Sequence, residues 1–131
     1  LLYGLESASL LSHDFRRLDG FHAACCRKLL RISHSFISRV SNAFVLSKLG
    51  SKALSQTVLE RQLKFFGQLA QRGQDDVVRS FVFEPGTYNV RAISARKHGR
   101  PPTHWNSTME KHARKVADPY PYQAVVANAT E

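Results

Sequence analysis

Residues 54–71 read LSQTVLERQLKFFGQLAQ, and this stretch decides the fold. Its apolar residues recur with the spacing of an α-helix, about 100° per residue. They cover about half of the helix circumference, which is wider than the stripe of an ordinary surface helix. We therefore expect this helix to be the central and most buried element. Its apolar residues are Leu54, Val58, Leu59, Leu63, Phe65, Phe66, Leu69 and Ala70.

A second amphipathic helix is predicted upstream, from Phe15 to Ile32, with Ser12 and Asp14 as favourable residues at its start. Its two sides differ sharply in chemistry, as an amphipathic surface helix requires. The side expected to face the core carries Phe15, Leu18, Phe21, His22, Cys25, Cys26, Leu29 and Ile32. The opposite side carries the basic stripe Arg16, Arg17, Arg27, Lys28 and Arg31.

Shorter helices are predicted around these two. Residues 33–38 break the helical pattern, after which Ser41 caps a helix over 42–49 that ends at Gly50. Asp75 and Asp76 suit the positive N-terminal end of a helix that continues to about residue 82. A last helix follows over 105–117, and its residue Trp105 is interpreted as a core anchor rather than a base-stacking platform.

The sequence thus predicts a mainly α protein, a small helical bundle of four to five helices with a basic extended arm and a disordered C-terminal tail. The expected parts are a thumb-like bundle over 1–86, the arm or linker over 87–104, the terminal helix over 105–117, and the tail over 118–131. The arm is expected to be extended because Pro101 and Pro102 restrict the residues before them.

Charge is the strongest clue to a partner. The 131 residues include 19 Lys and Arg against 10 Asp and Glu, a formal net charge of +9. Such a balance favours nucleic acid over small acidic substrates. No apolar run approaches the roughly 18 residues of a membrane span, and no secretory signal is evident, so no membrane partner is expected. The chain starts at Leu1 without an initiator Met, and we expect it to be part of a larger protein.

His22, Cys25 and Cys26 raise the question of a metal or a nucleophile. Structural zinc needs about four ligands, usually in two spaced pairs, and no second cysteine pair exists here. Packing within the helix is therefore the preferred interpretation, with His22 bonding a neighbouring carbonyl, and no metal is assigned. Two adjacent cysteines cannot build a disulfide framework and indicate a reduced, intracellular protein. We expect it in the nucleus, the cytoplasm or both.

No catalytic motif is found: there is no phosphate-binding glycine loop, no HExxH and no GxSxG. No catalytic residue is assigned. The basic groups are better candidates, because Lys and Arg that neutralise phosphates supply most sequence-independent affinity for nucleic acid. The predicted nucleic-acid-binding residues are the stripe Arg16, Arg17, Arg27, Lys28 and Arg31, together with Arg91, Arg96, Lys97, Arg100, Lys111, Arg114 and Lys115.

Several segments, in order, resemble one family. Residues 1–7 are similar to the "LLYGSE-W" motif, 17–30 to "RL-FH--CLR-IL", 39–42 to "RVSN", 61–69 to "RRLRWLGHV" and 99–105 to "GRP---W". This order and spacing resembles the thumb and post-thumb region of non-LTR (LINE-type) retrotransposon reverse transcriptases, over residues 1–117. The family's Trp and His in the fourth motif are Phe65 and Gln68 here, and its basic run before the Trp is replaced by Pro102, Thr103 and His104.

The resemblance implies that helices after the polymerase palm grip the template–primer backbone, RNA or DNA. The palm aspartates and their Mg²⁺ ions would lie upstream of Leu1, so no cofactor is expected here, and the chain alone is not expected to be an RNA-directed DNA polymerase. Two alternatives stay open. The chain could be a docking module that packs on the missing palm, or an independent helical DNA-binding domain.

Overall fold

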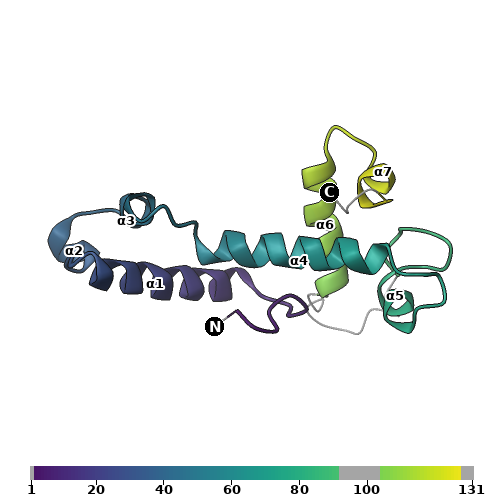
Figure 1. The fold of residues 1–131 in the computed structure, drawn as a ribbon, viewed down its shortest axis with the longest axis horizontal. Coiled ribbons are helices and arrows are strands. Elements are labelled where there is room, and N and C mark those ends of the chain that lie inside the picture. Colours follow the sequence, from purple (N-terminus) through teal and green to yellow (C-terminus); the bar gives the residue numbers. More distant parts are fainter. Residues whose placement is uncertain (1, 92–103, 128–131) are drawn as a thin grey trace, which may run out of the picture. The chain divides into compact units, whose positions relative to one another are not determined.

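The computed structural model describes residues 2–91 and 104–127, and the chain in these ranges is mainly helical, as the sequence predicts (Figure 1). Seven helices lie in the described part: α1 (Ser12–Leu29), α2 (Ser35–Ser38), α3 (Asn42–Lys48), α4 (Leu54–Ala70), α5 (Val77–Val82), α6 (Trp105–Ala117) and α7 (Tyr122–Ala127). The predicted helices over 42–49, 54–71 and 105–117 are confirmed to within one residue at each end.

The chain divides into two compact units. Unit 2 is Leu10–Glu60, and unit 1 is formed by Leu1–Ser9 together with Arg61–Glu131. The division falls inside α4, whereas the boundaries at 86, 104 and 117 stay predictions. A long helix that contributes to both units gives no break in composition where one unit ends.

Unit 2 consists of α1, α2, α3 and the first residues of α4, and α3 packs on α1 (Figure 1). Local signals set the starts of these helices. The hydroxyl of Ser41 accepts a hydrogen bond from the backbone N–H of Phe44 (3.2 Å) and caps α3 as predicted. The carboxylate of Asp19 on α1 accepts from the backbone N–H of Ser55 (2.9 Å), which satisfies a free donor in the first turn of α4.

The buried side of α1 differs from the predicted one. Its buried residues are Ala23, Cys26 and Arg27, whereas Phe21 and Leu29, both predicted to face the core, are 56% and 77% exposed. Cys26 is buried as predicted, and the other predicted core-facing residues are half-buried: Phe15, Leu18, His22, Cys25 and Ile32. The apolar pattern therefore identified the helix and most of the side that packs, but the buried side is shifted toward Ala23 and Arg27.

Unit 1 has an aromatic core. The ring of Phe66 lies 5.1 Å from that of Phe83 and 6.1 Å from that of Trp105, and Phe65 also contacts Trp105. Trp105 is therefore a core anchor, as interpreted from the sequence. The amide of buried Gln62 donates to the carbonyls of Leu5 (2.8 Å) and Ala8 (2.9 Å), which fixes the N-terminal segment to α4.

A buried arginine joins the turn after α4 to α5. The Arg79 guanidinium donates to the carbonyls of Ala70 (3.3 Å) and Thr87 (3.0 Å) and to the side-chain oxygen of Gln74 (3.2 Å). It also lies over the ring of Tyr88, 5.6 Å from the centroid. These contacts hold the segment after α5, where Phe83 and Val90 form an isolated antiparallel bridge.

The predicted disorder of residues 118–131 is wrong for part of this segment. Residues 122–127 form α7, which packs on α6 and buries Tyr122 and Val126. The guanidinium of Arg114 lies 4.5 Å from the centroid of the Tyr122 ring. A helix of this length depends on such packing for its stability, and two apolar positions four residues apart are too short a signal to stand out in sequence.

Candidate nucleic-acid interface

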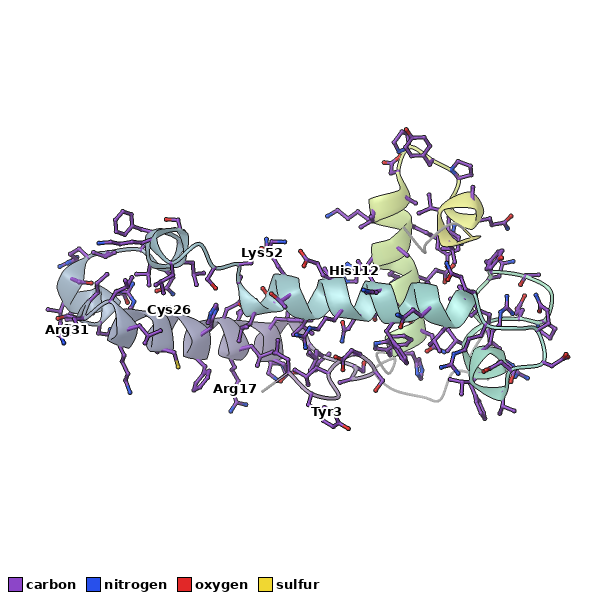
Figure 2. All side chains as sticks on the ribbon, in the orientation of Figure 1. Tyr3, Arg17, Cys26, Arg31, Lys52 and His112 are labelled. Carbon is purple, nitrogen blue, oxygen red and sulfur yellow. The ribbon has the colours of Figure 1, made fainter. Side chains whose placement is uncertain are left out.

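Four cations of the predicted basic stripe are exposed along α1 or directly after it. Arg16, Arg17 and Lys28 are exposed, and exposed Arg31 follows the helix directly. Figure 2 shows the side chain of Arg17 extending from α1 and Arg31 at the C-terminal end of that helix. None of the four forms an ion pair with a carboxylate in residues 2–91 or 104–127. Their charges are therefore available to a polyanion.

Arg31 is held in place by the way α1 ends. Its backbone is left-handed (φ 54°), its N–H donates to the carbonyl of Lys28 (3.2 Å), and the next residue, Ile32, donates to the carbonyl of Arg27 (2.9 Å). This is the Schellman pattern of hydrogen bonds, in which the left-handed position usually belongs to glycine. A cation at the last turn is favoured by the negative end of the helix dipole. The turn thus adds a fourth exposed charge beside Lys28.

Arg27 was predicted to bind nucleic acid, and the structure contradicts this. It is only 5% exposed, and its guanidinium donates to the carbonyls of Ser33 (3.1 Å) and Val40. It also donates to the hydroxyl of Ser38 (3.2 Å) and to the side-chain oxygen of Asn42 (2.9 Å). A guanidinium has five N–H donors, and here they are used within unit 2. Arg27 therefore organises the segment between α1 and α3 and does not reach phosphate.

The predicted basic residues of unit 1 divide into three groups. Arg91 donates to the carbonyl of Ser80 (3.0 Å), and Arg114 pairs with Glu110 (2.7 Å), so both already have internal partners. Lys111 and Lys115 are exposed on α6, and neither forms an ion pair with a described residue. The other three arm residues lie outside the described residues: Arg96, Lys97 and Arg100. The case for phosphate contact is thus strongest on α1.

Six exposed cations of the described residues were not predicted. Lys52, Arg61 and Arg72 pair with carboxylates, whereas Arg39, Lys48 and Lys64 form no ion pair with a described residue. Arg39 caps the end of α2 in a left-handed conformation (φ 56°), and Lys48 ends α3. Neither belongs to a long amphipathic helix, so a search for a basic stripe does not find them. A count of charge in unit 2 would have drawn attention to Arg39 and Lys48, because residues 10–60 hold eight Lys and Arg against three Asp and Glu.

The His22–Cys25–Cys26 group packs within unit 2, as preferred from the sequence. Cys26 is buried, Cys25 is partly buried, and both are free thiols. The imidazole Nε2 of His22 lies 3.4 Å from the hydroxyl of Ser51 rather than against a carbonyl, which corrects that detail of the prediction. In residues 2–91 and 104–127, no three His, Cys, Asp or Glu side chains are placed to share a metal ion.

Comparison with known proteins gives no match: no family model, no curated protein and no solved structure is similar to this chain. Among the described residues, no helix combines the length and apolar character needed to cross a membrane. The chemistry of the α1 surface is therefore the main guide to function. Exposed guanidinium and ammonium groups without counter-ions can bind phosphate oxygens, and they offer no general base or nucleophile.

Proposed function

We propose that this chain is a non-catalytic nucleic-acid-binding segment that contacts the phosphate backbone through the exposed cations of α1. One observation carries the proposal. Arg16, Arg17, Lys28 and Arg31 lie on or directly after one helix, are exposed, and have no carboxylate partner among the described residues. Charges left without partners favour a polyanion, because binding releases the counterions condensed on it.

The resemblance to LINE-type reverse transcriptases supports the same role. We infer that the chain follows a polymerase palm, grips template–primer there, and acts inside the cell, in the nucleus or the cytoplasm. In such a parent protein the palm carboxylates would hold the Mg²⁺ ions and perform RNA-directed DNA synthesis. The contribution of this chain would be grip, which needs packed helices and outward-facing cations rather than reactive groups.

The test compares two variants with the same reduction in charge. One replaces Arg16, Arg17, Lys28 and Arg31 with Gln. The matched control replaces four exposed cations that already have carboxylate partners, namely Lys52, Arg61, Arg72 and Arg114. Binding of a fluorescent duplex is measured by anisotropy over a range of salt concentrations, and circular dichroism verifies that each variant is folded.

We expect the α1 variant to weaken binding to all sequences alike and to flatten the salt dependence. The logarithmic slope should fall by about 0.9 for each phosphate that the variant no longer neutralises. The control should keep most of the slope. A third variant, with Arg96, Lys97 and Arg100 changed to Ala, measures any contribution of the predicted arm in the same way.

Two outcomes would overturn this proposal. Equal slopes for the α1 variant and the unmodified protein would show that these cations do not meet phosphate. A strong preference for one sequence would indicate an independent DNA-binding domain instead, because contacts to the backbone alone carry no sequence information.

A docking role is the second candidate, and α5 favours it. Val77 and Phe81 are 67% and 70% exposed, lie four residues apart on one side of the helix, and have Val78 beside them. Exposed apolar side chains grouped in this way are typical of a protein contact. If Val77→Ser/Phe81→Ser abolished binding to a reverse transcriptase palm and left affinity for duplex unchanged, docking would be supported as a separate role.

A further inference from the structure

An aromatic side chain stands within the cationic surface of α1. Phe21 is 56% exposed, although the sequence pattern placed it in the core. Arg17, Phe21 and Lys28 follow one another at i, i+4 and i+11, a spacing that keeps them on the same side of a helix. Phe21 makes no ring contact and no cation–π contact with any residue in 2–91 or 104–127.

Two of the neighbours of Phe21 are small. Gly20 and Ala24 are both exposed, and the long side chain of Arg17, four residues before Phe21, makes no cation–π contact with the ring, which is 56% exposed. An added Cβ at Gly20 would meet no atom within 4 Å, which shows that the space beside it is open. A flat apolar ring with open surroundings and a cation on either side is suited to a ligand that is itself flat and negatively charged.

We propose that Phe21 stacks on an unpaired base, and that α1 therefore binds single-stranded nucleic acid in preference to duplex. This inference rests on the proposed function, since it assigns a substrate to the same surface. Base stacking on an exposed aromatic ring, combined with backbone contacts from Lys and Arg, is a general way to bind a single strand. In a duplex the base faces are covered by their neighbours, so only the cations could contribute.

The dimensions of α1 agree with a short single strand. Arg17 and Lys28 are eleven residues apart, which corresponds to about 16 Å along a helix axis. At about 3.4 Å for each stacked nucleotide, this distance spans roughly five nucleotides. Phe21 lies between the two cations, so a base can stack on it while flanking phosphates reach Arg17 and Lys28.

The charge distribution favours nucleic acid over a lipid surface. A helix that lies on a membrane presents a broad apolar face with cations confined to the other side. On α1 the exposed ring is single and has Arg17 and Lys28 on its own side of the helix. On a membrane, this arrangement would bring charged groups toward the acyl chains. A nucleic acid strand presents bases and phosphates in alternation, which matches the ring and the flanking cations of α1.

The experiment measures the affinity of the full chain for a fluorescent twelve-nucleotide single strand and for the blunt duplex of the same sequence. Three variants are compared: Phe21→Ala, Phe21→Trp, and the matched control Phe44→Ala, which removes an equally exposed ring (54%) from α3 of the same unit. Phe21→Ala should weaken single-strand binding at least about fivefold and change duplex binding less than twofold, with the same salt slope. Phe21→Trp should restore the affinity, and Phe44→Ala should leave it unchanged.

The two proposals fail in different ways. If Phe21→Ala and Phe44→Ala had the same single-strand affinity while the four-Gln variant of α1 lost its salt dependence, stacking would be wrong and backbone binding would stand. If the four-Gln variant bound both oligonucleotides as well as the unmodified chain, both proposals would be wrong. Stacking is supported most directly if Phe21→Ala binds the duplex more tightly than the single strand, while Phe21→Trp keeps the affinities of the unmodified chain.

Discussion

Replacing Arg27 with Met tests the idea that this arginine stabilises unit 2 from inside. Met has a similar length, fills much of the same space and removes the five hydrogen bonds that the guanidinium makes to four acceptors. Asn42 is exposed and Ser38 only partly buried, so both side chains can turn to water. The carbonyls of Ser33 and Val40 belong to the backbone and cannot turn away in this manner. At about 1–1.5 kcal/mol for each of these two bonds, we expect the free energy of unfolding to fall by about 2–3 kcal/mol.

Urea unfolding followed by circular dichroism measures this change. Lys28→Met is the matched control, since it alters an adjacent, exposed cation and should change stability by no more than about 0.5 kcal/mol. Arg27→Lys separates geometry from charge: an ammonium group cannot reach acceptors on several sides, so it should recover only part of the stability. Amide exchange should accelerate most between residues 33 and 42. If Arg27→Met were as stable as Lys28→Met, the internal role of Arg27 would be refuted.

Three further predictions concern single side chains. The backbone N–H of Arg79 lowers the pKa of Asp76 below its usual 3.8, so the stability contributed by this cap is present above about pH 4 and is lost as pH falls through the folded pKa. Asp76→Asn should flatten that acid dependence in unfolding experiments. Burial, followed by the charge of Glu110, raises the pKa of Tyr122 to about 12. The free energy of unfolding should therefore decline as pH rises from 10 to 12, because the phenol ionises more readily in the unfolded chain. Tyr122→Phe should remove this decline. Cys26→Ala should lower the free energy of unfolding by about 1 kcal/mol, because it leaves a small void. Elemental analysis of the unmodified protein should find no stoichiometric zinc. Bound zinc would contradict the packing role of this cysteine.

Local signals predicted most of the helices. The apolar period of residues 54–70 and the caps Ser41 and Asp76 act over one or two turns, so sequence alone contains the information. The single turn α2 and the short helix α7 were missed because four to six residues carry too little periodicity. Contacts with other elements accompany these short helices: Arg27 on α1 donates to the hydroxyl of Ser38 in α2, and Tyr122 of α7 is buried against α6.

The candidate interface was predicted only in part. The sequence indicated which residues of α1 are basic, and Arg16, Arg17, Lys28 and Arg31 are exposed as expected. It also placed Arg27 among them, because composition cannot distinguish an arginine that meets solvent from one that satisfies backbone carbonyls. The position of Phe21 was wrong for the same reason, since an apolar side chain was assumed to be buried.

The sequence by itself determined that this protein is mainly helical, strongly basic, and built around residues 54–70, because charge and helical period are properties of the chain alone. Only the tertiary structure decided that the buried side of α1 extends to Ala23 and Arg27 and leaves out Phe21. That choice depends on the segment between α1 and α3, whose carbonyls need donors, and on Ala23, which is small enough to be buried within the unit. Burying Arg27 there leaves Phe21 in solvent among cations.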